Sequence, residues 1–174
     1  SLPKRDIDTL FYSNGEKEKI ISHLDNYISK KDFYEKKQIL YKTGILLYGS
    51  PGTGKTTIVK ALAHKYNRQI LQLNMATIDT MDLNTLTTCI NNDNNKFIVL
   101  MEDIDTLFLN RSDEFKKVDR EVVNKLLQFL DSNNSPKDVI FIATTNHVNN
   151  LDDALIREGR FDLKVEIAPL KEKE

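Results

Sequence analysis

The chain has 174 residues, 40% of them hydrophobic and 29% charged, which suits one globular domain over residues 1–174 and excludes a membrane segment or a disordered tail. Lysine and arginine number 25 against 26 aspartate and glutamate, so no basic footprint predicts a nucleic-acid partner. No apolar run approaches the roughly eighteen residues of a membrane span, and the N-terminus lacks the apolar core of a signal peptide.

Residues 1–42 are expected to form a helical lead-in to the first strand of the domain. Ser13-Asn14-Gly15-Glu16 has the S-x-x-E form of a capping box, with Ser13 as the N-cap. Apolar residues then repeat at helical spacing, at Ile20, Ile21, Leu24, Tyr27 and Ile28. The pattern predicts an amphipathic helix over residues 14–30, and the charged stretch that follows carries Phe33 and Tyr34, which are expected to join the local core.

A glycine-rich sequence lies between a buried-strand pattern over 44–48 and a helical pattern over 57–63. It reads Gly49-Ser50-Pro51-Gly52-Thr53-Gly54-Lys55-Thr56, and its spacing G-x-x-x-x-G-K-[ST] is that of a phosphate-binding P-loop. The alternative to a P-loop is a glycine-rich turn that has this spacing by chance. A strand directly before the motif and a helix directly after it make that alternative rare, so the sequence predicts a nucleotide site.

Each fixed residue type of this motif has a physical task. The glycines let successive N–H groups face phosphate oxygens, and the helix N-terminus adds a positive dipole. Lys55 is placed to reach the outer phosphates, and the Thr56 hydroxyl is placed to ligate Mg²⁺. The predicted ligands are ATP or ADP with Mg²⁺, bound by the motif and by Thr57 directly after it.

The next two elements are a strand over 69–74 and a helix that carries Leu83, Leu86 and Ile90 at helical spacing. The helix is expected to end in the asparagine-rich surface turn at 91–95. Cys89 lies within the helix and is expected to be a small buried hydrophobe. As it is the sole cysteine, no internal disulfide can form, which favours a reducing, intracellular compartment.

Two carboxylates follow the continuous apolar run over 97–101, which is typical of a buried parallel strand. Ligands bind at the carboxyl ends of such strands, where Glu102 and Asp103 stand. One carboxylate there can hold Mg²⁺ through water and the other can orient an attacking water. An acidic strand end that only turns the chain, or an ion pair, is the alternative; the two acids directly after five apolar residues favour function.

The remaining elements complete an α/β pattern. A helix is predicted around the apolar positions of 122–130, a buried strand over 139–144 and an edge strand over 163–167. The alternation of strands and helices predicts a three-layer α/β/α fold of the P-loop type, with a five-stranded parallel sheet and helices on both faces.

Further polar residues follow the strand over 139–144. Asn146 stands where an amide could hold the water or the γ-phosphate, while Arg157 and Arg160, three residues apart, are ordinarily a solvated surface pair. His23 and His64 lie on predicted helices and are expected to be solvated, because the chain has no histidine spacing typical of a metal site.

Four segments resemble, in order and spacing, the large nucleotide-binding subdomain of AAA+ ATPases: residues 49–56, 97–105, 144–146 and 151–162. The resemblance covers nearly the whole chain and implies the sheet order 5-1-4-3-2. It also implies that Asn146 is the sensor-1 residue and that Arg157 and Arg160 are arginine fingers, which reach the nucleotide of a neighbouring subunit. The adenine is then expected near Ser13, Asn14 and Gly15.

Within that superfamily, residues 29–34, 41–49, 102–105 and 145–147 resemble the mitochondrial inner-membrane AAA chaperones that translocate the Rieske iron–sulfur protein. This resemblance implies a mitochondrial inner-membrane location for the full-length protein. Most AAA+ chains have aspartate then glutamate at the strand end, whereas this chain has Glu102 then Asp103, as that branch does. By position Glu102 takes the metal-water role and Asp103 the water-polarising role, and the inverted order leaves the assignment open.

The resemblance implies a homo-oligomeric ring, hexameric or heptameric, that hydrolyses Mg-ATP to remodel or translocate a protein substrate. Residues 74–83 lack the aromatic-hydrophobic-glycine loop of peptide-threading unfoldases, which argues against threading of an unfolded chain. The sequence stops at Glu174, before the helical lid, so a core subdomain with very weak activity of its own is expected. A P-loop kinase of a small acceptor and a nucleotide-gated scaffold without turnover stay open as alternatives.

Overall fold

The computed structural model describes residues 6–12, 14–109, 116–131, 136–151, 153–156 and 160–168. Within these residues, five strands form one parallel sheet in the order β2-β3-β4-β1-β5. The strands are β1 (Lys42–Tyr48), β2 (Gln69–Asn74), β3 (Phe97–Glu102), β4 (Val139–Thr145) and β5 (Leu163–Glu166). The predicted strand order and the predicted α/β fold class are both confirmed.

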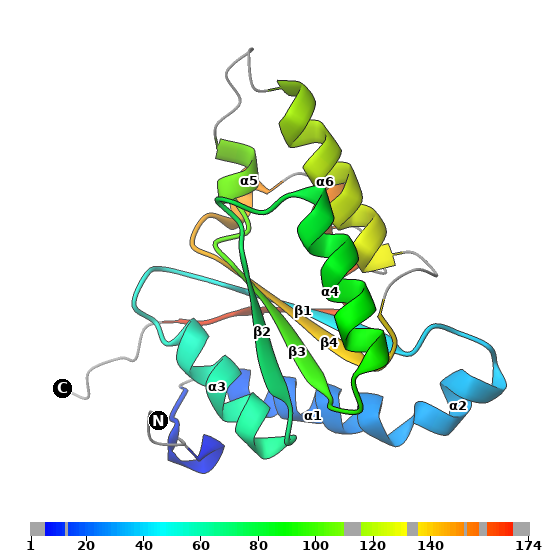
Figure 1. The fold of residues 1–174 in the computed structure, drawn as a ribbon. Helices are drawn as coiled ribbons and strands as arrows, with labels where there is room; N and C mark the ends of the chain where they lie inside the picture. The colour runs from blue at the N-terminus through cyan, green and yellow to red at the C-terminus, as the bar shows by residue number, and fades with distance from the viewer. Residues whose placement is uncertain are drawn as a thin grey trace.

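Helices cover both faces of the sheet, as Figure 1 shows. On one face lie α1 (Glu16–Ser29) and α3 (Lys55–Lys65), and on the other α4 (Thr80–Asn92) and α6 (Lys116–Asp131). Shorter helical segments complete the described chain: η1 (Ile7–Thr9), α2 (Lys31–Lys36), α5 (Thr106–Leu109), η2 (Val148–Asn150) and α7 (Asp153–Ile156). In the described residues, no helix is both long and apolar enough to span a bilayer.

The apolar runs of the inner strands follow from this layering. Every residue of β4 is buried, and so are the first five residues of β3, because each strand has neighbours on both edges and helices on both faces. The edge strand β2 is only partly buried and mixes polar with apolar residues. Two core clusters result, one on each side of the sheet.

The predicted capping box at the start of α1 is wrong. The N-cap is Gly15, whose φ of 75° lies in the left-handed region, and helix α1 begins at Glu16. Glu16 instead accepts a hydrogen bond from the Asn14 N–H at 2.9 Å, while Ser13 lies outside the described residues. Glycine adopts the left-handed conformation at little cost, so a backbone turn, not a side-chain cap, starts the helix.

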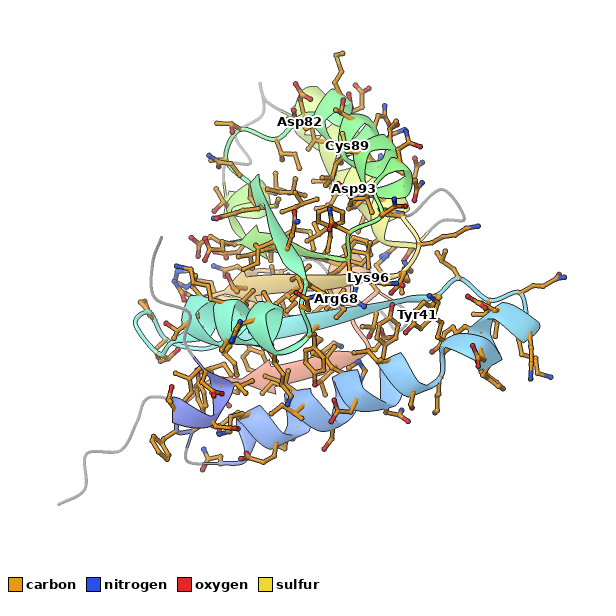
Figure 2. All side chains as sticks on the ribbon, turned by 60° about the horizontal axis from the view of Figure 1, so that its bottom comes forward. Tyr41, Arg68, Asp82, Cys89, Asp93 and Lys96 are labelled. Atoms are coloured by element: carbon orange, nitrogen blue, oxygen red, sulfur yellow. The ribbon has the colours of Figure 1, made fainter. Side chains whose placement is uncertain are left out.

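Three side chains differ from their predicted environments. Cys89 is exposed on α4 (Figure 2), because the helix buries Leu83 and Ile90 and turns the other side outward. Phe33 is 52% exposed, whereas Tyr34 packs against the core as predicted. His23 is half-buried, and its Nε2 lies 2.8 Å from the Thr43 hydroxyl.

Burial lowers the pKa of His23, and the nearby Asp162 carboxylate opposes that shift. The Thr43 hydroxyl donates its proton to Asp162, so His23 Nε2 donates to the Thr43 oxygen. The histidine is thus part of a polar chain that joins α1 to the segment before β5. His64 is exposed, as predicted.

An ionic cluster lies at the end of the sheet where the parallel strands begin. Arg68, directly before β2, donates to the carbonyl oxygens of Phe97 and Asp138 at 3.3 and 2.9 Å and pairs with the Asp138 carboxylate at 3.1 Å. Lys31 and Lys96 pair with the other oxygen of that carboxylate. Figure 2 shows Tyr41, Arg68 and Lys96 at this end. Three segments far apart in sequence therefore bind one carboxylate that a fourth segment carries.

The segment before β5 approaches β1 closely at Gly44. The Asp162 N–H donates to the Gly44 carbonyl oxygen at 2.8 Å, and the Gly44 N–H donates to the Asp162 carboxylate at 2.9 Å. A Cβ atom at residue 44 would lie 2.2 Å from the Arg160 carbonyl oxygen. Only glycine fits this approach.

Replacing Gly44 with alanine is therefore expected to lower the free energy of unfolding by about 1 to 3 kcal/mol, the usual cost of forcing extra atoms into a packed site. The added methyl group must displace backbone, which cannot rotate away as a side chain can. Urea denaturation of the wild type and the variant measures the difference. An unchanged midpoint and slope would show that the close approach does not persist in solution.

Candidate functional site

The glycine-rich loop joins β1 to α3 at the carboxyl end of the sheet. Gly49, Gly52 and Gly54 have φ values of 145°, 74° and 90°, in the region that favours glycine. None of the described residues accepts a hydrogen bond from the N–H groups of Gly52, Thr53 or Gly54. Together with the N-terminus of α3, these donors make a cradle for an anion, as the P-loop spacing predicts.

Lys55 lies inside this loop and is only 8% exposed. Its ammonium group donates to the carbonyl oxygens of Gly49 and Ser50, at 3.0 and 2.8 Å, and contacts the Thr53 hydroxyl at 3.4 Å. Burial lowers the pKa of Lys55, and the Asp103 carboxylate opposes the shift. The ammonium group is thus a donor to oxygen acceptors within the loop, and phosphate oxygens are acceptors of the same kind, so Lys55 fits a phosphate-binding role.

One hollow of about 420 Å³ brings the predicted residues together. Its lining combines the loop with the ends of β3 and β4: Pro51, Gly52, Thr53, Gly54, Lys55, Thr56, Thr57, Glu102, Asp103, Thr144 and Asn146. A larger hollow, of about 670 Å³, lies beside Asp138 at the other end of the strands, and no residue of the loop lines it. The smaller hollow is the candidate site because the phosphate cradle and the carboxylates meet there.

Glu102 is the last residue of β3 and points toward the start of α3. One carboxylate oxygen accepts a hydrogen bond from the Thr56 hydroxyl, and the other accepts one from the Gln72 amide at 2.5 Å. Since the Thr56 proton is donated to Glu102, lone pairs on the Thr56 oxygen remain free to ligate a cation. Thr56 and Glu102 therefore form a pair of oxygen ligands, one direct and one suited to act through water.

Asp103 follows Glu102 in the left-handed conformation, with φ of 50°. Its N–H lies 3.3 Å from the Thr144 hydroxyl oxygen, and the next N–H, of Ile104, donates to the Thr144 carbonyl oxygen at 3.0 Å. The Thr145 hydroxyl donates to the buried Asp105 carboxylate at 2.7 Å. These bonds fix the ends of β3 and β4 against each other, which sets Asp103 and Asn146 on one wall of the hollow.

Three residues near the site were not predicted as site residues, although Asp105 lies within a segment that resembles the AAA+ family. Gln72 on β2 contacts Glu102, and Asp105 joins the two strand ends. Tyr12 donates its hydroxyl to the Gly54 carbonyl oxygen at 3.2 Å. Burial, and secondarily the nearby Glu16 carboxylate, raise the pKa of Tyr12, so the hydroxyl stays protonated and able to donate. A single polar residue on a strand or in a loop has no periodicity, and only tertiary contacts reveal its role.

The other predicted site residues lie away from the hollow or outside the described residues. Arg160 pairs with Asp131 at the end of α6, through Nε at 2.7 Å and Nη2 at 2.6 Å. Arg157 and Ser13 lie outside the described residues. Asn14 and Gly15 directly precede α1 and are not among the residues that line the hollow.

The described residues fit Mg²⁺ held jointly with phosphate. Mg²⁺ prefers oxygen ligands and is usually bound by one or two carboxylates together with substrate phosphates. Thr56 and Glu102 supply hydroxyl and carboxylate oxygens beside the cradle. Among the described residues, no group of three or more His, Cys, Asp or Glu side chains forms a metal site of its own.

Comparisons with known proteins agree with this geometry. Residues 45–169 match the family described as "ATPase family associated with various cellular activities (AAA)". The chain is 34% identical over 173 residues to "Probable mitochondrial chaperone BCS1-A" of Dictyostelium discoideum, covering 94% of this chain and 40% of that protein. It is 32% identical over 167 residues to human "Mitochondrial chaperone BCS1", covering 92% and 40%. The chain thus spans about two fifths of the length of these relatives.

Proposed function

The chain belongs to the AAA family of ATPases, and on that premise we propose that it binds Mg-ATP in the hollow beside Lys55 and hydrolyses ATP when subunits assemble into a ring. The observation that carries the proposal is that one hollow is lined by the phosphate loop and by Glu102, Asp103 and Asn146. A phosphate cradle alone would bind nucleotide. The carboxylates at its wall supply what hydrolysis needs.

The residues divide the work according to their contacts. The loop N–H groups and Lys55 hold the phosphates, and when bound, Mg²⁺ would neutralise charge on the β- and γ-phosphates. We assign Glu102 to the metal side because its carboxylate already holds the Thr56 hydroxyl. Asp103 is assigned to orient the attacking water and to take its proton, and Asn146 to hold the water or the γ-phosphate by its amide.

Arg157 and Arg160 are proposed to act on the nucleotide of a neighbouring subunit. The Arg160 carbonyl oxygen lies against Gly44, near the start of β1. The phosphate loop begins at Gly49, directly after β1, and the five residue steps from Gly44 to Gly49 span roughly 17 Å of extended chain. Arg160 therefore cannot serve the loop of its own subunit. To contact a phosphate in a neighbour, its guanidinium must exchange the Asp131 carboxylate for that phosphate.

The wider role is proposed from the relatives. Their names describe mitochondrial chaperones, so we propose that the whole protein works in mitochondria, at the inner membrane, as a hexameric or heptameric ring that remodels or translocates a protein substrate. Adenine is proposed to bind beside Ser13, Asn14 and Gly15, since the neighbouring Tyr12 touches the phosphate loop.

Replacing Lys55 with alanine tests the nucleotide site. Hydrogen bonds to charged groups are worth about 1.5 to 3 kcal/mol, so we expect ATP affinity to fall by roughly tenfold to a hundredfold. The fold should persist because the ammonium group contacts only the loop itself. Calorimetric titration measures both affinities. Lys60→Ala, an exposed lysine on the same helix, is the matched control, and equal ATP affinity for Lys55→Ala and wild type would refute the site.

A further inference from the structure

The Glu102 carboxylate is held by two neutral donors from two different elements. Thr56, on α3, donates its hydroxyl to one carboxylate oxygen, and Gln72, on β2, donates its amide N–H to the other at 2.5 Å. The Thr56 contact connects Glu102 to the phosphate loop. The Gln72 contact connects it to the edge strand of the sheet and has no counterpart in the function proposed above.

The sheet register explains why Gln72 reaches Glu102. Strands β2 and β3 are parallel, with Gln72 opposite Leu100 and Asn74 opposite Glu102. Side chains two residues apart on a strand share a face, so Gln72 and Glu102 are diagonal neighbours on one face of the sheet. Such neighbours lie within reach of long side chains. At residue 72, glutamine is long enough to span this diagonal.

A neutral amide has a particular effect on this carboxylate. With only the Thr56 hydroxyl as a partner, the carboxylate could turn its second oxygen toward solvent. The Gln72 amide fixes that second oxygen and therefore the plane of the carboxylate. Unlike a lysine or arginine in the same place, the amide does so without cancelling the negative charge that attracts a cation.

We propose that Gln72 is a positioning residue that holds the Glu102 carboxylate in the orientation that binds the water shell of Mg²⁺. The proposal rests on the proposed Mg-ATP function and adds a residue outside the loop and the acidic pair. Partners of metal-binding groups orient those groups, and their loss typically lowers metal affinity by about 10- to 100-fold. Gln72 is exposed and lies on an edge strand, so replacing it removes the amide without opening the core.

The test compares Gln72→Leu with Gln69→Leu. Both glutamines are exposed and lie on β2, but Gln69 begins the strand at the end away from Glu102. ADP affinity is measured by calorimetry at a series of Mg²⁺ concentrations and in EDTA. For Gln72→Leu we expect the Mg²⁺ concentration at half-maximal enhancement of ADP affinity to rise about tenfold, with ADP affinity in EDTA unchanged. Gln69→Leu is expected to match the wild type.

A double-mutant cycle separates positioning from a general effect on the strand. In a Glu102→Gln background, Gln72→Leu should cause no further change in the Mg²⁺ requirement, because its only proposed partner has lost the charge. A Gln72→Leu protein with the wild-type Mg²⁺ requirement, or one equally impaired with and without Glu102, would overturn the proposal while leaving the nucleotide site intact. A wild-type protein whose ADP affinity does not respond to Mg²⁺ would instead overturn the proposed Mg-ATP function, and the role of Gln72 with it.

Discussion

Replacing Asp103 with asparagine is expected to lower ATP turnover by the assembled protein by about 10²- to 10⁴-fold while Mg-ATP still binds. Asparagine can hold a water by its amide oxygen but cannot take the proton that the water loses on attack. The backbone should be undisturbed, because the left-handed conformation at residue 103 suits asparagine nearly as well as aspartate. Phosphate release measures turnover, and calorimetry with Mg-ATP measures binding.

The neighbouring Glu102→Gln variant is the matched comparison. It keeps a side chain for the Thr56 hydroxyl to contact but removes the charge, so we expect a higher Mg²⁺ requirement for nucleotide binding. We therefore expect substitutions at these two adjacent residues to cause different defects, one in turnover and one in the Mg²⁺ requirement. If Glu102→Gln binds Mg-ATP normally and loses only hydrolysis, the two roles are reversed, and if Asp103→Asn keeps its turnover, the water-polarising role is wrong.

Replacing Asp138 with asparagine is expected to lower the free energy of unfolding by about 3 kcal/mol, near the lower end of the usual cost of breaking a buried ion pair. The change leaves the Arg68 guanidinium, only 5% exposed, without its carboxylate, and it also removes the partner of Lys31 and Lys96. The lower end applies because the Asp138 side chain itself keeps 17% exposure, and its lysine partners are partly solvated. Urea denaturation measures the loss.

Asparagine is the informative replacement at this position. Residue 138 has φ of 56°, a left-handed conformation that asparagine adopts more readily than alanine, so the substitution changes the charge with little added backbone strain. Asp93→Asn is the control, since Asp93 is exposed and borders a hollow at the same end of the sheet. We expect that control to change the unfolding free energy by less than about 0.5 kcal/mol. Equal losses for the two variants would contradict a special role for Asp138.

The elements that the sequence predicted best are those whose pattern has one physical cause. Strands β3 and β4 are buried on both faces, and a strand in that position must be apolar throughout, so its residues mark it directly. The phosphate loop was equally clear, because its glycines and Lys55 have fixed spacing between a strand and a helix. The position of Glu102 and Asp103 followed from these, since parallel strands end at one edge of the sheet.

The predictions that were wrong have a common origin, because each rests on a local sequence pattern that is compatible with two different structures. Ser13 to Glu16 matches a side-chain cap, but the chain uses the left-handed freedom of Gly15 instead. Cys89 is apolar in type and lies on a helix, yet the face of α4 that packs on the sheet is set by Leu83 and Ile90. His23 has polar neighbours only because Thr43 and Asp162 are brought to it from two distant segments.

The sequence by itself determined the α/β class, the strand order through its family resemblance, and the residues of the phosphate loop and its acidic neighbours. Periodicity and fixed spacing are local properties, and local properties can be read along a chain. The tertiary structure alone decided that Gln72 holds Glu102, that Tyr12 touches the loop, and that Arg68, Lys31 and Lys96 share Asp138. These contacts join residues 30 to 107 positions apart, and a hydrogen bond or ion pair imposes no pattern on the chain between its partners.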